Sequence, residues 1–237
     1  MILSIIVPIF NEEKTVEEIL RRITRVKLPN PLKKEIIVVD DGSNDNSKFK
    51  IQNSKLNKTV KFFSHKSNLG KGVAVRTGLN HATGDIIIIQ DGDLEYDPSY
   101  YPTLLAPILE NLTDIVYGTR LASYPLKLWG QDKTILPLHL VANKILTTLT
   151  NLLYNAKLTD METCYKVFKK DCLKGIRLKS NGFNFEPEIT AKFLKKGYKI
   201  MEVAIKVKPR TYQEGKKIGW IDGVKAVFTL LRCRFYD

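Results

Sequence analysis

Short aliphatic runs alternate with longer amphipathic stretches along the first half of the chain. The runs predict strands and the amphipathic stretches predict helices. Within each run the aliphatic residues are continuous rather than alternating, which is typical of strands covered on both faces of a parallel sheet. The predicted strands cover residues 4–7, 35–39, 60–63 and 86–90, and the predicted helices between them cover residues 12–26, 43–50 and 71–81. This alternation predicts an α/β fold with a mostly parallel, twisted sheet wound with helices.

The second half of the chain alternates less regularly but still holds both kinds of element. Its predicted strands cover residues 114–118, 163–168 and 200–207, and its predicted helices cover residues 134–153, 186–196 and 218–235. The last helix places Trp220, Val224, Phe228 and Leu231 at helical spacing, which fits either core packing or a helix that lies on a membrane surface. No repeat or linker divides the two halves, so we expect one domain over residues 1–237.

The composition narrows the class of protein. Hydrophobic residues make up 43% of the chain and charged residues 27%, which excludes disordered and fibrous classes. The charge is unusual, because 38 Lys and Arg against 25 Asp and Glu give a net charge of +13. Such a surplus attracts nucleic acid, anionic lipid headgroups or phosphorylated substrates. The basic residues are scattered and no aromatic-rich recognition motif accompanies them, so we expect no nucleic-acid partner.

The cysteines and the apolar stretches bear on the compartment. Cys164, Cys172 and Cys233 are odd in number and lack the spacing of paired metal ligands, which argues against a disulfide framework and favours a reducing cytosol. Met1 leads into a predicted strand without the charged start of a signal peptide. Polar residues interrupt the stretch 135–153 well short of the ~20 apolar residues that a membrane span needs. We therefore expect a cytoplasmic protein.

Acidic residues gather where the strand over residues 86–90 ends. Asp91, Asp93 and Glu95 stand there at alternate positions, with Gly92 among them. Alternate positions of an extended segment share a face, so we expect the three carboxylates to converge. Like charges this close repel unless a cation lies among them, and Mg2+ prefers a few carboxylates together with phosphate oxygens. The pattern predicts a metal-held diphosphate, and a solvated acidic turn is the alternative.

Two other predicted strands also end in polar residues, at 8–12 and at 40–43. The carboxyl ends of parallel strands meet at one edge of a sheet, where ligands of such folds bind, and this convergence favours the metal site. Asp40 and Asp41 point to opposite faces, so only one of them is expected to face a ligand. The glycines around Lys71 lack the spacing of a phosphate-binding loop, and we expect them to allow close packing of a helix on the sheet.

Taken together, these strand ends resemble the family 2 glycosyltransferases, and within them the dolichol-phosphate mannose synthase-like branch. The resemblance extends from Ser4 to about Gly219, and the segments that carry it cover residues 7–12, 39–43, 70–72, 91–93, 118–120 and 210–216. It implies a GT-A fold, a nucleotide-diphosphate sugar donor, Mg2+ or Mn2+ as cofactor, and inversion at the anomeric carbon. It also implies a Rossmann-like half that binds the nucleotide sugar (residues 1–118), an acceptor half (119–210), and a basic loop followed by a C-terminal amphipathic helix (211–237).

The resemblance also assigns roles to individual residues. The implied metal ligands are Asp91, Asp93 and Glu95, although the family often has glutamine or serine in place of Glu95. Phe10 stands where the family usually has tyrosine. The implied donor-binding residues are Pro8, Phe10, Glu12, Val39, Asp41, Asp91, Gly92, Asp93, Arg120, Arg210 and Lys216.

The nature of the acceptor decides which residues act in catalysis. A lipid phosphate is already anionic and can attack unaided, steered by Arg120, whereas a sugar hydroxyl needs a carboxylate as general base. Asp160, close to Glu162 in the sequence, is the candidate base, and the alternative is that these two are helix-end or sugar-binding carboxylates. With Asp93 at the metal, the expected catalytic residues are Asp93, Asp160 and Arg120. The arginine that many polyprenyl-phosphate synthases carry in the following helix is absent from residues 138–143.

We therefore expect an enzyme that transfers a hexose to a polyprenyl phosphate of the dolichyl or undecaprenyl type. Such an acceptor and the positive net charge predict a peripheral protein on the anionic inner face of the cell membrane. The alternative is a glycosyltransferase that acts on a saccharide or another hydroxyl acceptor in the synthesis of cell-surface polysaccharide.

Overall fold

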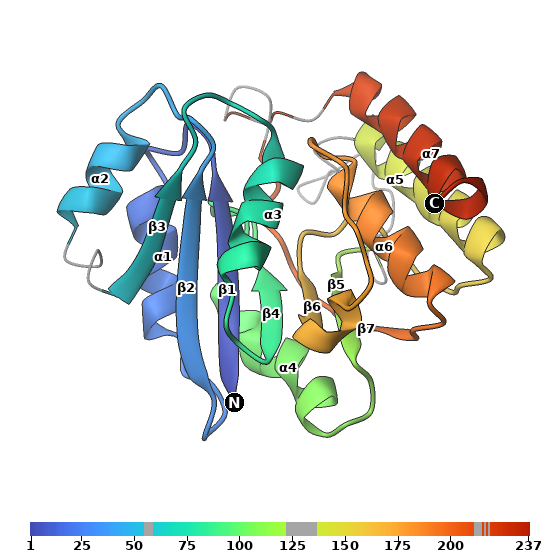
Figure 1. The fold of residues 1–237 in the computed structure, drawn as a ribbon, viewed down its shortest axis with the longest axis horizontal. Helices are drawn as coiled ribbons and strands as arrows, with labels where there is room; N and C mark the ends of the chain where they lie inside the picture. Colours follow the sequence, from blue (N-terminus) through green and yellow to red (C-terminus); the bar gives the residue numbers. More distant parts are fainter. Residues whose placement is uncertain (55–58, 122–136, 211–214, 216, 218) are drawn as a thin grey trace, which may run out of the picture.

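The structure is a computed structural model that describes residues 1–54, 59–121, 137–210, 215, 217 and 219–237 (Figure 1). Within these residues a seven-stranded sheet forms the body of the protein. The strands are β1 (Ile2–Ile9), β2 (Lys33–Asp40), β3 (Val60–Ser64), β4 (Ile86–Ile89), β5 (Ile115–Thr119), β6 (Lys166–Lys169) and β7 (Ile200–Ala204). The helices are α1 (Val16–Arg25), α2 (Ser47–Asn53), α3 (Lys71–His81), α4 (Tyr101–Leu109), α5 (Pro137–Tyr154), α6 (Phe185–Lys195) and α7 (Trp220–Phe235), with 3-10 turns at Pro98–Tyr100 and Lys170–Leu173.

The sheet confirms the predicted α/β fold with mostly parallel strands. Its order is β3-β2-β1-β4-β6-β5-β7, and only β6, between β4 and β5, runs antiparallel to its neighbours among the described strands. β1 lies between β2 and β4, and its register pairs Ile9 with Asp40 and Ile6 with Ile89. The chain therefore leaves β1, β2 and β4 at the same edge of the sheet, which brings the three polar strand ends together.

Several predicted boundaries shift by a few residues. The helix predicted over residues 12–26 begins only at Val16, because Thr15 forms a turn with Glu12 and donates a hydrogen bond to the carbonyl of Gly92. The strand predicted over 163–168 begins at Lys166, because the Thr163 hydroxyl bonds the carbonyl of Gly118 and the segment before Lys166 leaves the ladder. Both shifts depend on partners that are distant in sequence, which local patterns do not reveal.

Helices cover both faces of the sheet and then add a further layer. α3 lies in front of the strands in Figure 1, whereas α1 and α4 lie behind them. α6 packs on β6 through the edge-to-face contact of Phe193 with Phe168, whose ring centroids are 5.2 Å apart. α5 and α7 pack against α6 on the side away from the strands, around a second apolar cluster that includes Leu146, Ala191 and Leu230. None of the described helices is both long enough and apolar enough to cross a membrane.

Glycines allow α3 to approach the sheet closely, as expected. A Cβ atom at Gly78 would lie 2.4 Å from Cγ2 of Ile6, which is fully buried in β1. Cβ atoms at Gly70 and Gly72 would collide with the backbone of residues 180–182. α3 can therefore sit against both the sheet and this loop only without side chains at these positions.

Replacing Gly78 with alanine is expected to destabilise the protein by about 1–3 kcal/mol, because the new methyl group overpacks the contact with Ile6. The matched control is Gly223→Ala in α7, where an added Cβ meets nothing within 4 Å. Removing this helix glycine is expected to stabilise the chain by about 0.5–1 kcal/mol. Urea denaturation followed by circular dichroism measures both changes, and equal midpoints for Gly78→Ala and the parent would contradict the proposed packing.

Candidate active site

A cavity of about 910 Å3 opens at the carboxyl edge of β1, β2 and β4. This volume falls within the roughly 300–1,000 Å3 typical of small-molecule sites. The described residues that were expected to bind the donor all line the cavity, with the exception of Val39. Those that line it are Pro8, Phe10, Glu12, Asp41, Asp91, Gly92, Asp93, Arg120 and Arg210.

Two of the expected donor-binding residues are not found in the lining. Val39 pairs with Pro8 on one side and Phe63 on the other, inside the sheet, and its side chain is fully buried in the core. The Val39 side chain therefore does not reach the cavity, because the residue precedes the end of β2 rather than following it. Lys216 lies outside the described residues.

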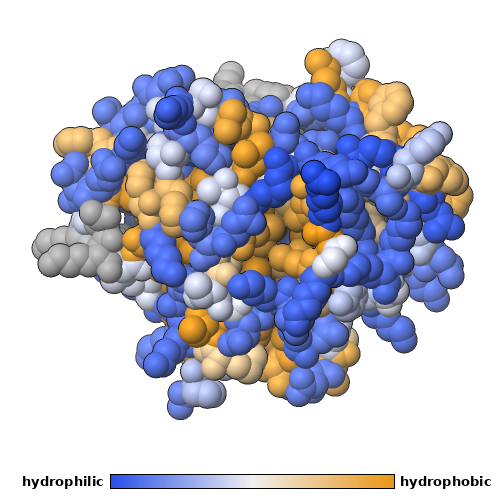
Figure 2. All heavy atoms as spheres, viewed as in Figure 1, coloured by the Kyte–Doolittle hydropathy of each residue, from blue (hydrophilic) through white to orange (hydrophobic). Residues whose placement is uncertain are grey.

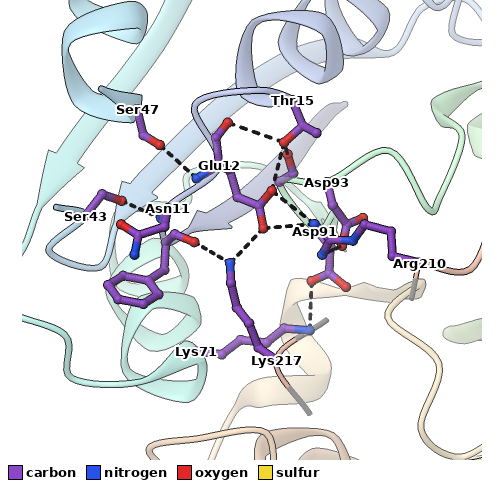
Figure 3. A network of polar contacts seen from close by, with 12 residues as sticks. Asn11, Glu12, Thr15, Ser43, Ser47, Lys71, Asp91, Asp93, Arg210 and Lys217 are labelled. Carbon is purple, nitrogen blue, oxygen red and sulfur yellow. Dashed lines mark hydrogen bonds and ion pairs between the residues drawn. The ribbon is translucent and has the colours of Figure 1, made fainter. Parts of the chain in front are cut away.

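Glu12 lies at the centre of a polar network at the end of β1 (Figure 3). Its carboxylate accepts a hydrogen bond from the Thr15 hydroxyl at 2.8 Å and pairs with Lys217 at 2.8 Å and Arg210 at 3.2 Å. Its backbone N–H donates to the Ser47 hydroxyl at 2.8 Å. Glu12 thus joins the end of β1 to α2 and to the basic residues near the C-terminus.

Asp41 faces the cavity and Asp40 does not, which agrees with the expectation that only one of them faces a ligand. The Asp41 carboxylate accepts hydrogen bonds from the backbone N–H groups of Leu69 (3.0 Å) and Gly70 (2.7 Å). His65 contacts the same carboxylate, with Nδ1 at 2.7 Å from Oδ1. Asp41 therefore holds the loop that leads into α3 against the end of β2.

The acidic segment after β4 has a geometry that differs from the expected one. Residues 92–96 form a series of bends instead of extended backbone, so the rule of alternate positions does not apply. Asp91 pairs with Lys71 at 2.7 Å, whereas Asp93 and Glu95 pair with the guanidinium of Arg210. The three carboxylates are thus near one another but are held by different cations.

Among the described residues, only Glu188, Cys233 and Asp237 bring three ligand atoms of His, Cys, Asp or Glu within 4.8 Å of one another. The oxygens of the three acidic-segment residues therefore do not converge to that degree. The Glu188 group is neutralised by Lys192 and Arg232, which lie 3.3 and 3.1 Å from Glu188. It therefore has no need of a metal cation.

The electrostatics of the acidic segment favour a cation nonetheless. Burial, followed by the charge of Asp91, raises the pKa of Asp93 to about 7 against the opposing effect of Arg210. Burial also acts on Asp91, but the charge of Lys71 outweighs it and lowers the pKa of that carboxyl. A divalent ion at Asp93 would relieve the repulsion that favours its protonated form. Hard carboxylate oxygens are also the ligands that Mg2+ and Mn2+ prefer, so these residues fit the expected metal.

Arg120, which lines the cavity, forms an ion pair with Asp160. Asp160 is fully buried, and its two oxygens accept from Nε and Nη2 of Arg120 at 2.6 and 2.7 Å. The backbone N–H of Arg120 and the Asn143 amide, at 3.0 and 3.2 Å, complete its contacts. Burial raises the pKa of Asp160, but the charge and hydrogen bonds of Arg120 outweigh burial and lower it. These contacts favour a carboxylate that orients Arg120 over one that accepts a proton from substrate.

Sequence reasoning missed Lys71 and Glu186 as residues of the site. Lys71 opens α3 and bridges Asp91 to Glu186, which lies in the first turn of α6 and 2.8 Å from the ammonium. Lys71 stood among the glycines noted in the sequence, which was a usable signal. Glu186 looked like an ordinary acidic residue in the first turn of a helix, and only the tertiary structure places it on the cavity.

Glu162 and Glu186 form a second acidic group on the cavity. Burial, followed by the charge of Glu186, raises the pKa of Glu162 to about 8 against the effect of the buried Lys166. Within the described part of the chain, Oε1 of Glu162 and Oε2 of Glu186 have no hydrogen-bond partner. Since unsatisfied buried oxygens are costly, a proton held by Glu162 lowers the cost.

Comparisons with known proteins relate the chain to a large sequence family. The sequence model for glycosyl transferase family 2 matches residues 4–177. Dolichol-phosphate mannosyltransferase from Pyrococcus furiosus is 28% identical over 233 residues, which cover 98% of this chain and 62% of that protein. Dodecaprenyl-phosphate galacturonate synthase from Rhizobium johnstonii is 27% identical over 189 residues, which cover 78% of this chain and 53% of that protein.

The fold has a close counterpart among solved structures. Glucosyl-3-phosphoglycerate synthase from Mycobacterium tuberculosis, solved in complex with Mn2+, uridine diphosphate and phosphoglyceric acid, superposes with a TM-score of 0.73. The match is 20% identical and covers 99% of this chain and 79% of that chain. This likeness confirms the expected GT-A fold.

The raised pKa of Glu162 predicts a pH-dependent stability. The folded chain binds the proton more tightly than the unfolded chain, where the pKa is near 4.5, so the stabilisation is complete below pH 4.5 and is lost as the pH rises through about 8. Glu162→Gln cannot ionise, so its free energy of unfolding should fall less steeply over this range than that of the parent. Urea denaturation across this pH range measures the difference. Parallel profiles of unfolding free energy against pH for the two proteins would show that folding does not raise the pKa of Glu162.

Proposed function

Since the chain belongs to glycosyl transferase family 2, we propose that it transfers a hexose from a nucleotide-diphosphate sugar to a polyprenyl phosphate. The chain is a glycosyltransferase, and the donor, the acceptor and the roles of single residues are what we propose. The observation that carries the proposal is that one cavity is lined by the acidic segment, by Arg210 and by Arg120, whose guanidinium is paired with the buried Asp160.

The nucleoside of the donor is assigned to the ends of β1 and β2. Pro8, Phe10, Glu12 and Asp41 line this side of the cavity. Glu12 and Asp41 are tied in place by their own hydrogen bonds, so their carboxylates are positioned before a ligand arrives. This side belongs to the first 118 residues, which we propose as the half that binds the nucleotide sugar. The second half, residues 119–210, contributes Arg120, Glu162 and Glu186 to the same cavity.

The diphosphate of the donor is assigned to the acidic segment. Asp91, Asp93 and Glu95 would hold Mg2+ or Mn2+, which when bound supplies Lewis-acid stabilisation of the leaving diphosphate. Arg210 opposes the protonation of Asp93 and brings positive charge to the place where negative charge develops. Lys71 favours the ionised form of Asp91. We propose that Lys216, in the basic segment after Arg210, also contacts the phosphates.

The acceptor phosphate is assigned to Arg120. Arg120 lines the cavity, and Asp160 fixes the plane of its guanidinium through two hydrogen bonds. A phosphate monoester is anionic near neutral pH and needs no base to attack the anomeric carbon, so steering by Arg120 suffices. On this assignment Asp160 positions Arg120. The names of the two relatives support a polyprenyl phosphate acceptor, and such an acceptor would hold the enzyme at the inner face of the membrane.

The donor site can be tested by ligand-induced stabilisation. Among nucleotide sugars such as UDP-glucose and GDP-mannose, one should raise the melting temperature in the presence of Mn2+ and do so much less after chelation. Asp93→Asn should lose the Mn2+-dependent shift and reduce transfer at least about a hundredfold. The matched control is Asp114→Asn, a half-exposed acid just before β5, at the opposite end of that strand from Arg120, which should keep both. A shift that Asp93→Asn retains in full would overturn the metal assignment.

The acceptor site can be tested with labelled donor. The parent should transfer sugar to polyprenyl phosphate in detergent micelles, and Arg120→Gln should lower kcat/KM for that acceptor about a hundredfold while the donor still raises the melting temperature. Transfer to a saccharide but not to the lipid phosphate would favour the alternative hydroxyl acceptor. In that case Asp160→Asn should abolish transfer and spare donor hydrolysis if Asp160 is the base.

A further inference from the structure

α5 and α7 carry matching stripes of exposed apolar residues. Of the fifteen large hydrophobic residues that are exposed in the described part of the chain, ten lie on these two helices or directly after α7. The α5 stripe and the α7 stripe both follow the spacing i, i+3, i+7, i+14, which places each on one helix face. The α5 stripe is Leu138, Val141, Ile145 and Leu152, and the α7 stripe is Ile221, Val224, Phe228 and Phe235.

The two helices lie side by side, so the stripes form one surface, which we name the α5/α7 face. Leu146 of α5 packs with Ala226 and Leu230 of α7, and the Tyr154 hydroxyl donates to the carbonyl of Leu230 at 2.7 Å. Figure 1 shows the helices together at the outer edge of the molecule, and Figure 2 shows hydrophobic atoms at this edge, over α7. Exposed apolar residues gathered in this way mark interaction sites.

The charges around the α5/α7 face favour an anionic partner. α5 carries no Asp or Glu, and α7 carries only Asp222, whose carboxylate caps its own helix by accepting from the Gly219 N–H at 2.9 Å. Lys144 and Lys225 are exposed on the same two helices. A second copy of the chain would bring its own net charge of +13 against this surface, and its α5/α7 face would supply no complementary acidic residues. An apolar stripe flanked by basic residues is the pattern of a helix that lies in an anionic lipid interface.

The α5/α7 face is continuous with the candidate active site. Leu138 and Trp220, which are 82% and 80% exposed, both line the cavity as well. Between them the lining includes the small residues Ala142, Gly223 and Ala226. A lipid chain that leaves the cavity between the two helices would therefore meet an apolar surface.

We propose that the α5/α7 face docks the enzyme on an anionic membrane, with the cavity opening toward the lipids, so that the acceptor enters from the bilayer. The inference rests on the proposed lipid-phosphate acceptor and adds the surface and the orientation that deliver it. Trp220 lies at the rim, where indole groups prefer the boundary between water and lipid.

The test is co-sedimentation with lipid vesicles. The parent should sediment with vesicles that contain phosphatidylglycerol, less with pure phosphatidylcholine vesicles, and less at high salt because the electrostatic part is screened. The double variant Ile221→Glu/Phe228→Glu alters two exposed residues outside the cavity lining, and its partition onto anionic vesicles should fall at least about tenfold. The matched control is Phe49→Glu on α2, which is 66% exposed at the opposite end of the molecule and should partition like the parent (Figure 1).

Activity separates this inference from the proposed function. The double variant should transfer sugar to polyprenyl phosphate in detergent micelles like the parent, and should lose transfer when the acceptor is presented in vesicles. Vesicle binding that the double variant retains would overturn the docking surface. The docking surface would also be overturned if the parent forms a dimer and binds no vesicles while the double variant is a monomer. If the parent binds vesicles through this face but uses no polyprenyl phosphate, the proposed acceptor fails and the docking surface stands.

Discussion

Negative charge buried at the carboxyl edge of the sheet is the constraint on which the site depends. Asp91 and Asp93 follow the end of β4, and burial, followed by the charge of Asp91, raises the pKa of Asp93. Two cations that are distant in sequence stabilise this arrangement, Lys71 at the start of α3 and Arg210 after β7. Carboxylates and cations at such a place form a charged site that is better suited to binding a metal ion and phosphates than to packing in a hydrophobic core.

The same constraint explains how the two halves of the chain are joined. Lys71 links Asp91 to Glu186 in α6, and Arg210 links Asp93 to Glu12, so ion pairs across the cavity connect the nucleotide half with the later elements. Close backbone contact of Gly70 and Gly72 with residues 180–182 brings α3 near enough for the Lys71 bridge. Packing and charge therefore act together, because the bridge requires the short distance and the short distance requires glycine.

The arrangement of α5 and α7 bears on the approach of the acceptor, as the charged residues of the site bear on the donor. One face of the two helices closes the cavity and covers α6, while the other carries apolar residues into solvent. A water-soluble donor and a lipid-borne acceptor need two different approaches to one anomeric carbon. A cavity with charged residues at the sheet edge and apolar residues at the helical rim offers both, which is how the structure connects the charge of the site to the proposed membrane surface.

The sequence by itself determined the strand and helix order, the parallel sheet and the convergence of three strand ends, because hydrophobic periodicity is local and the carboxyl ends of parallel strands must share an edge. It also singled out Asp91, Asp93 and Arg120 through their place in motifs. Only the tertiary structure decided that residues 92–96 bend, that Val39 faces the core, that both oxygens of Asp160 contact Arg120, and that Lys71 and Glu186 join the site. Each of these depends on a partner many residues away, and the chain pattern around a residue carries no information about such partners.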